Sequence, residues 1–145
     1  MNISVKKGVT QLVFGMKQKD VEDLYNLPDR QYKDDDGNII YLYNAKKMRL
    51  TFYADEDYRL GYIIASHPEL EIFSEKIIGR KWELVSSIAK NKGIKDFEKE
   101  TFDSVDSYFN ESNWIIFQVE FGEVLRVELG AIINNKTDEF EWQFK

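Results

Sequence analysis

Cysteine is absent from the 145 residues of this chain. Its absence excludes disulfide bonds, thiolate metal sites and cysteine nucleophiles, and it is compatible with a reducing compartment. Histidine occurs once, at His67, whereas a catalytic zinc ion normally takes three protein ligands that often include several histidines. Because His67 directly precedes Pro68 and follows an expected strand, we predict that it lies in a solvent-exposed loop.

Long apolar runs are also lacking. No segment approaches the roughly 18 residues of a membrane span, and the segment Met1–Lys7 has no apolar stretch of the kind found in signal peptides. We therefore expect a cytoplasmic protein with no membrane partner. With 43% hydrophobic residues the chain has enough apolar material for a real core, and its length fits a single domain.

Catalytic motifs are missing as well. The chain contains no phosphate-binding loop, no Gly-x-Ser-x-Gly elbow and no glycine-rich dinucleotide fingerprint. The run Asp34-Asp35-Asp36 begins like a calcium loop, but Gly37 is fourth instead of sixth, and Ala45 stands where an EF-hand has its glutamate. We expect a polar turn there, no metal or other cofactor, and a protein that is not an enzyme.

The net charge of −6 is unevenly distributed. Residues 96–145 hold 12 acidic and 4 basic residues, giving −8, whereas residues 1–95 hold 14 acidic and 16 basic residues, giving +2. An acidic field repels nucleic acid and steers basic protein partners, although an ordinary solubilising surface has the same composition. We expect no nucleic-acid partner, and both interpretations of the acidity stay open.

Two stretches about 65 residues apart share an order of features that indicates an internal repeat. Each has an apolar residue and a glycine, then apolar residues six and nine positions after the glycine on one helical face. Helices are expected over residues 17–26, ended by Leu27-Pro28, and over residues 81–91, ended by Gly93. The matched positions are Phe14, Gly15, Val21 and Leu24 in the first stretch, and Ile78, Gly79, Val85 and Ile88 in the second.

The strands that follow match at an offset of 65 residues. A strand at about 38–43 or 104–109 precedes a hairpin in each copy, and the matched hairpin positions keep their parity, as one buried face requires. Segments 70–78 and 140–144 are expected to pair at the sheet edges. The positions predicted to point inward are Leu50, Phe52, Leu60, Tyr62, Ile64, Ile115, Phe117, Leu125, Val127 and Leu129.

These patterns predict an α+β fold built as a single domain over residues 1–145. Two repeats, about 8–70 and about 72–133, would each contribute one helix and three strands to a shared, curved antiparallel sheet. A C-terminal strand at about 139–144 would complete it. Both helices would pack on one face of the sheet, which leaves the other face open.

The order Phe14-Gly15-Met16, then Val21, Leu24 and Leu27-Pro28, resembles the opening motif of the small lipoprotein of the outer-membrane barrel-assembly machinery. A tandem version of that unit is similar to the β-lactamase inhibitor protein fold. This chain lacks the cysteines of both, so neither membrane anchoring nor β-lactamase as a target carries over. The resemblance implies a sheet whose uncovered face docks onto another protein.

Strand parity identifies the residues of that open face, and they combine aromatic, arginine and carboxylate side chains, as protein interfaces do. The alternative is that the aromatic residues only cover the sheet. Acidic residues near the C-terminus are added as candidates for steering a partner. The candidates are Arg49, Tyr53, Arg59, Trp114, Ile116, Gln118, Glu120, Arg126, Glu128, Asp103, Asp106, Glu139 and Glu141, with Thr51 and Ile63 on the same face.

The leading hypothesis is a bacterial, cytoplasmic protein-binding module. In its most specific form it is an immunity protein or inhibitor that occludes a toxin or enzyme, with a basic protein as one candidate, using an acidic, aromatic sheet face. A self-associating structural module, and thus a homo-oligomer, is the second class. A small-molecule-binding protein or enzyme is the third, and it would require a deep pocket between sheet and helices.

Overall fold

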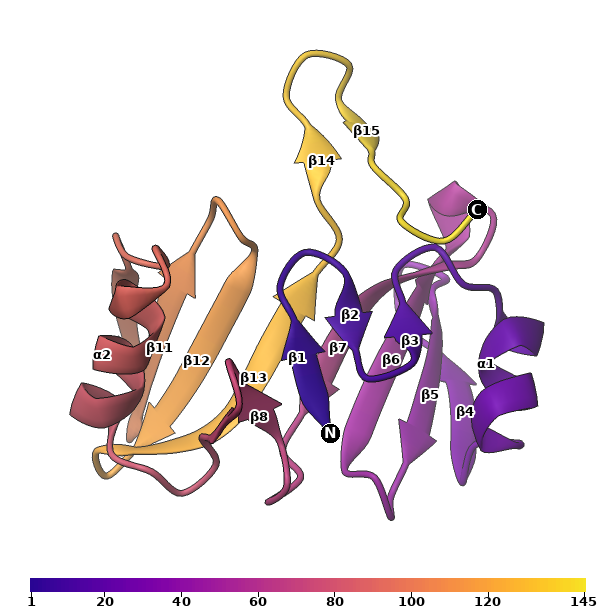
Figure 1. Ribbon diagram of the computed structural model, residues 1–145. Coiled ribbons are helices and arrows are strands. Elements are labelled where there is room, and N and C mark those ends of the chain that lie inside the picture. Colours follow the sequence, from indigo (N-terminus) through magenta and orange to yellow (C-terminus); the bar gives the residue numbers. More distant parts are fainter.

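The computed structural model describes residues 1–145, and eight strands form its main sheet, which is antiparallel throughout. The order across this sheet is β10-β11-β12-β13-β7-β6-β5-β4 (Figure 1). The strands are β4 (Arg30–Lys33), β5 (Ile39–Tyr43), β6 (Met48–Tyr53), β7 (Arg59–Ala65), β10 (Glu98–Phe102), β11 (Val105–Asn110), β12 (Ile115–Glu120) and β13 (Glu123–Gly130).

Seven shorter strands and three helical segments complete the chain. Five of these strands form a second sheet in the order β3-β2-β1-β8-β9, and the last two form a C-terminal hairpin. Their bounds are β1 (Asn2–Ser4), β2 (Gly8–Val9), β3 (Leu12–Val13), β8 (Glu71–Ile72), β9 (Glu75–Lys76), β14 (Ile133–Asn134) and β15 (Glu139–Phe140). The helices are α1 (Gln18–Tyr25), α2 (Trp82–Asn91) and a short 3-10 turn, η1 (Ala54–Glu56).

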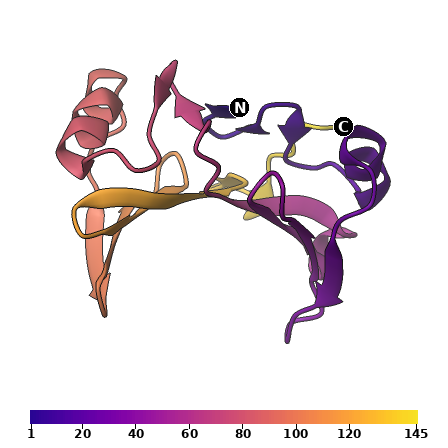
Figure 2. The same ribbon diagram turned by 90° about the horizontal axis from the view of Figure 1, so that it is seen from below.

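The main sheet is bent into an arch, and the two long helices and the second sheet pack on one side of it, whereas Phe140 of the C-terminal hairpin contacts Tyr53 on the other side. Figure 2 shows α1 and α2 over the two ends of the arch, with the N-terminal strands between them, all on the convex side. A core cluster of 28 buried residues links both helices and both sheets. The concave side of the arch is left without a covering layer.

Both helices lie where their sequence signals place them. The Asp20 carboxylate accepts the backbone N–H of Lys17 at 2.9 Å, which satisfies a donor at the start of α1. Asn26 ends that helix with a φ of 65°, just before Leu27-Pro28, and Gly93 follows α2 with a φ of 84°. The expected helix ranges, 17–26 and 81–91, are confirmed to within a residue or two. Neither helix is long and apolar enough to cross a membrane.

The predicted fold class, α+β with two helix-plus-three-strand units, is wrong. Strands make up 43% of the residues and helices only 14%, and each helix precedes four strands of the main sheet. Edge strands β4 and β10 were missed because their side chains are mostly exposed and show no apolar alternation. Strands β1, β2 and β3 are only two or three residues long, which is too short for a periodic pattern.

The two halves of the main sheet nevertheless make the same backbone hydrogen bonds. Gly15 N–H donates to the Leu60 carbonyl, and Leu60 N–H donates to the Met16 carbonyl. The same pair of bonds joins Gly79 to Val124 and Val124 to Arg80, each residue 64 positions later in the chain. These matching bonds favour the internal-repeat hypothesis, and common ancestry of the halves stays a prediction.

Two β-bulges overturn part of the predicted burial. The register between β6 and β7 shifts between Thr51 and Phe52, which leaves Gly61 as an extra residue. The register between β12 and β13 shifts between Gln118 and Val119, which leaves Leu125 as an extra residue. An extra residue inverts the parity of everything beyond it. As a result Tyr62, Ile64 and Leu125 are not buried in the core as predicted, whereas Ile63, expected on the open face, is fully buried.

The predicted edge strands are confirmed only in part. Segment 70–78 contains β8 and β9, which pair in the second sheet instead of extending the main one. In segment 140–144 only Phe140 belongs to a strand. The calcium-like run is the turn between β4 and β5, where the Asp34 carboxylate accepts the backbone N–H groups of Asp36 and Asn38 at 2.9 Å each.

Candidate binding face

The uncovered side of the main sheet, here called the concave face, is assembled from alternate residues of all eight strands. Its residues share the parity opposite to the buried core positions, and cross-strand pairs align them from one edge to the other. They are Arg30, Tyr32, Leu42, Arg49, Thr51, Tyr53, Tyr62, Ile64, Glu98, Glu100, Ser107, Phe109, Ile116, Gln118, Glu120, Arg126 and Glu128. Ile40 has the same parity but is fully buried.

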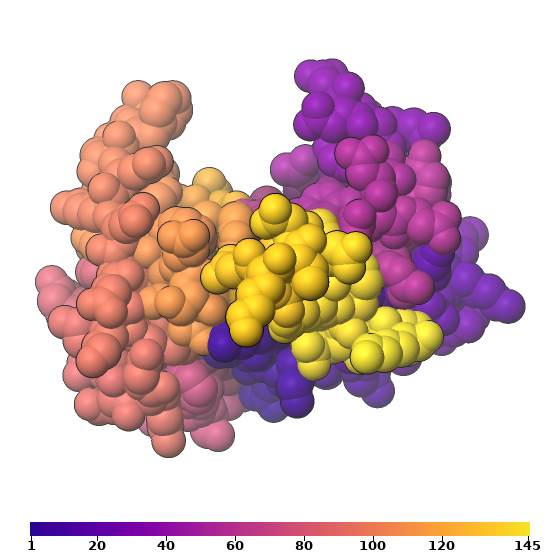
Figure 3. Space-filling view, turned by 90° about the horizontal axis from the view of Figure 1, so that it is seen from above, coloured from indigo at the N-terminus to yellow at the C-terminus, as the bar shows by residue number.

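The concave face is a hollow between two walls. Figure 3 shows it end-on, with the C-terminal hairpin in front: strands β4 to β6 rise on one side and β10 to β12 rise on the other. These are called the first wall and the second wall below, and β7 with β13 form the floor between them. The arch therefore presents a shaped surface in place of a flat sheet.

A chain of side-chain hydrogen bonds crosses the floor and reaches the second wall. The Tyr62 hydroxyl donates to one oxygen of Glu128 at 2.5 Å, and the Gln118 amide donates to the other oxygen at 2.6 Å. The Ser107 hydroxyl donates to the Gln118 carbonyl oxygen at 2.6 Å. Burial, and then the bond to the Glu128 carboxylate, raise the pKa of the Tyr62 hydroxyl, so it remains a donor at ordinary pH. The network fixes these side chains in one arrangement.

Aromatic rings lie at both ends of the floor, each over a glycine. The Trp114 ring covers Gly130, where an added Cβ would lie 2.7 Å from the ring. It also makes edge contacts with Tyr62 and Phe109, at 5.4 and 4.9 Å between ring centroids. The Tyr53 ring covers Gly61 in the same manner, with a Cβ distance of 2.1 Å. The glycines thus allow the rings to lie flat on the sheet.

Arg49 is the least satisfied group of the concave face. Its Nε atom is buried and has no hydrogen-bond partner within the protein. Directly across the strands, Leu42 lies on one side of Arg49 and Ile64 on the other, and neither side chain accepts a hydrogen bond. A buried donor left unpaired costs about 1–3 kcal/mol, and more where the group is charged.

Most of the predicted interface residues are brought together on this face. They are Arg49, Tyr53, Ile116, Gln118, Glu120, Arg126 and Glu128, with Thr51 beside them. Trp114 lies in the β11–β12 turn and packs on this face against Tyr62 and Phe109.

The other candidates lie elsewhere. Asp106 is on the opposite side of the sheet, where Lys99 lies 4.0 Å from it, and Asp103 is in the β10–β11 turn. Glu139 and Glu141 belong to the C-terminal hairpin and tail, where Glu141 accepts a bond from the Asn134 amide at 2.8 Å.

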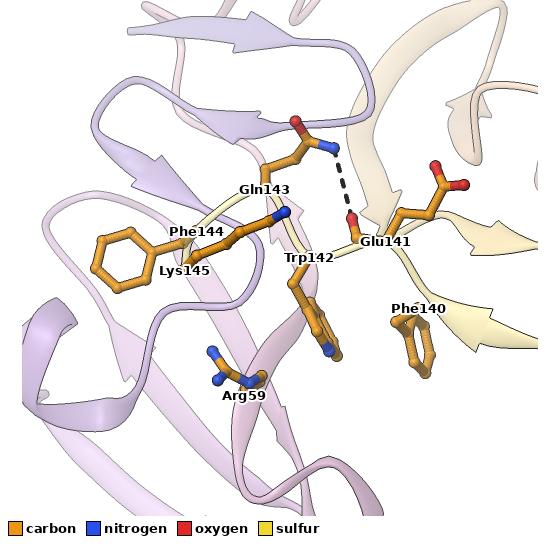
Figure 4. Close-up of a pocket in the computed structure, with 7 residues that line it drawn as sticks. All are labelled: Arg59, Phe140, Glu141, Trp142, Gln143, Phe144 and Lys145. Carbon is orange, nitrogen blue, oxygen red and sulfur yellow. Dashed lines mark hydrogen bonds between the residues drawn. The ribbon is translucent and has the colours of Figure 1, made fainter.

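Arg59 is held by its own chain at the base of the C-terminal tail. One of its guanidinium nitrogens donates to the Gly15 carbonyl at 2.8 Å. Figure 4 shows Trp142 beside Arg59, with the rings of Trp142 and Phe140 side by side; the centroids of these rings are 4.7 Å apart. The hollow that they line, of about 590 Å³, is formed largely by the last six residues of the chain. Arg59 therefore lies beside the tail and lines this hollow together with it.

Several residues of the concave face were not foreseen. Tyr62 and Ile64 were assigned to the core because a bulge is not visible as a break in apolar alternation. Glu98 and Glu100 lie on β10, which was not recognised as a strand. The one signal in the sequence was Gly61, since an isolated glycine inside a strand pattern often marks a bulge.

Comparison with known proteins gives the fold and nothing finer. No protein-family model and no curated protein sequence matches the chain. Among solved structures, an extracellular protein containing an SCP domain from Bacillus anthracis has a TM-score of 0.53 at 12% identity, over 89% of this chain and 50% of that one. A DUF4309-family protein (YjgB) of Bacillus subtilis has a TM-score of 0.52 at 16% identity, over 86% and 84%.

A third match, a cysteine-rich secretory protein from Staphylococcus aureus, has a TM-score of 0.49 at 18% identity, over 81% of this chain and 42% of that one. This chain therefore spans half or less of two of the three proteins. The resemblance to the barrel-assembly lipoprotein and the β-lactamase inhibitor protein stays a prediction.

Proposed function

We propose that this protein is a binding module that receives another protein on its concave face. The observation that carries the proposal is the one-sided covering of the main sheet: two helices and a second sheet cover the convex side, and no layer covers the concave side. Trp114, Tyr62 and Arg49 lie partly exposed on this face and outside the core cluster. Tryptophan, tyrosine and arginine are the usual anchors of protein interfaces.

The expected roles of immunity protein or inhibitor, and the basic toxin or enzyme as partner, are specific forms of this proposal. These roles differ in the identity of the partner, which the crosslinking experiment described next would identify. One fold neighbour is described as extracellular. The proposal requires no particular compartment, so the cytoplasmic location stays a separate prediction.

Site-specific photo-crosslinking in cells of the source organism tests the proposal. A photoreactive amino acid replaces Thr51, on the concave face, or Lys90, an exposed residue of α2 on the convex side. We expect a discrete adduct with a second protein from position 51 and none from position 90, identified by mass spectrometry. An adduct with a second copy of this chain would support the self-associating module instead. The same set of adducts from both positions would contradict the proposal.

A further inference from the structure

The charges of the concave face are separated between its two walls. Arg30 and Arg49 project from the first wall, which has no acidic residue on this face. Glu98, Glu100 and Glu120 project from the second wall, which has no basic residue on it. The register establishes this sidedness, because Glu98 pairs with Phe109 and Glu100 with Ser107 across β10 and β11. The hollow therefore has a cationic wall facing an anionic wall.

The floor between the walls carries charges of both signs. Glu128 is already engaged, because Tyr62 and Gln118 donate to its two oxygens. Arg126 lies on the same strand, and its side chain forms no ion pair. The floor thus adds little net charge, and the separation between the walls is retained across it.

Arg49 shows that the cationic wall lacks a partner within the protein. No carboxylate lies within 4.0 Å of it, as the three ion pairs of the chain all involve lysine. Its Nε donor is buried without an acceptor, between the apolar neighbours Leu42 and Ile64. A guanidinium presents several donors in a planar fork that matches a carboxylate. Because Nε itself is buried, a carboxylate from outside the chain would pair with the terminal guanidinium nitrogens of Arg49, which are not among the buried unpaired atoms.

We propose that the hollow binds a polypeptide segment whose charges are separated in the opposite sense. Acidic side chains of this segment contact Arg49 and Arg30, and basic side chains contact Glu98, Glu100 and Glu120. An apolar or aromatic residue between them packs on Tyr62 and Trp114 at the floor. This inference rests on the proposed function and adds the chemistry of the partner, which is dipolar and not simply basic.

Selection of binders from a displayed library of random linear peptides tests the inference without a known partner. The full chain is the immobilised target. We expect enrichment of peptides that carry acidic and basic residues in separate blocks. The charge reversal Arg49→Glu should weaken the selected peptides by about tenfold or more, as loss of a charged hydrogen bond does. The double substitution Glu98→Lys and Glu100→Lys should also weaken peptide binding, because it repels the basic block of the peptides.

Matched controls lie on the same strands but on the convex side. Lys99 stands between Glu98 and Glu100, and Lys33 follows Tyr32 on β4; both are exposed. Lys99→Glu and Lys33→Glu should leave peptide affinity unchanged. Because Arg49 is half-buried, Arg30→Glu on the exposed edge of the first wall serves as the second variant if Arg49→Glu unfolds.

The outcomes separate this inference from the broader proposal. Suppose that the selected peptides bind the concave face, but that charge reversals on the walls and at the control positions change their affinity equally. This result would overturn the inference of a charge-separated partner and leave the proposed binding module intact. Purely basic peptides that bind independently of Arg49 and Arg30 would do the same. A library that yields no enriched peptide also overturns the inference of a linear segment. The crosslinking result at position 51 alone decides the broader proposal.

Discussion

At the scale of single residues, tyrosine hydroxyls are held neutral on both faces of the main sheet. Tyr62 does this on the concave face. Tyr41, which is almost fully buried on the convex side, accepts a bond from the Gln18 amide at 2.8 Å and donates to the Glu22 carboxylate. Burial first, and then the bond to Glu22, raise the pKa of Tyr41 to about 12. Each hydroxyl can donate its bond to the neighbouring carboxylate only while it keeps its proton.

The raised pKa of Tyr41 predicts a loss of stability at alkaline pH. A tyrosine in the unfolded chain ionises near pH 10, so between about pH 10 and pH 12 only the unfolded state releases this proton. The unfolded state then binds fewer protons, and the free energy of unfolding falls as pH rises. Tyr41's contribution is therefore complete below pH 10 and is lost towards pH 12.

Urea unfolding of the wild type and of Tyr41→Phe at a series of pH values measures this. The difference in unfolding free energy between the two should decrease from pH 10 upward. Tyr58→Phe is the control, since the Tyr58 hydroxyl makes no hydrogen bond within the protein. A difference that stays constant up to pH 12 would show that Tyr41 ionises in the folded state as it does in the unfolded chain.

At the scale of elements, the two halves of the main sheet differ in what covers the start of their helices. An added Cβ at Gly15 would lie 2.7 Å from the Phe144 carbonyl oxygen and 3.1 Å from Trp142 Cβ. Phe144 N–H also donates to the Phe14 carbonyl at 3.0 Å. At the equivalent Gly79 nothing lies within 4 Å of such a Cβ. The C-terminal tail covers the first half alone.

This asymmetry provides a matched pair of substitutions. Both glycines have positive φ, 107° at Gly15 and 81° at Gly79, so alanine at either position carries backbone strain. Only Gly15→Ala also pushes against the tail, which should cost about 1–3 kcal/mol more by overpacking. Chemical unfolding measures the loss of unfolding free energy in each variant. Exchange of the Phe144 backbone amide hydrogen should accelerate only in Gly15→Ala. Equal losses from the two substitutions would show that the tail is not firmly docked.

The elements also show how far the sequence predicts this structure. Helices were found because Val21 and Val85 mark a buried face and clear signals end both segments. Strands β6 and β12 were assigned their correct inward faces by alternation. Beyond the bulges at Gly61 and Leu125 the parity inverts, and alternation alone cannot reveal that. The charge separation was also hidden, because it depends on β10, whose exposed residues Glu98–Phe102 carry no strand pattern.

At the scale of the whole molecule, the two halves of the main sheet meet along one seam. Strands β13 and β7 pair over four residue pairs, from Val127 with Ala65 to Gly130 with Tyr62. The buried core runs across this seam without interruption, from the region of α1 to the region of α2. A shared core of this kind predicts that the halves fold and unfold together as one domain.

A cavity at the seam should therefore destabilise both halves equally. Leu129 is buried there opposite Ile63, and Leu129→Ala should cost about 2–5 kcal/mol. Two variants report on separate halves, each with Trp114 replaced by phenylalanine. In one variant Trp82, beside the second half, is the only remaining tryptophan. In the other variant Trp142, in the tail on the first half, is the only remaining tryptophan. Fluorescence-monitored urea unfolding should give coincident transitions that shift together. If only one midpoint shifts, the halves are separate folding units, and a ligand that bridges the two walls would have to hold them together.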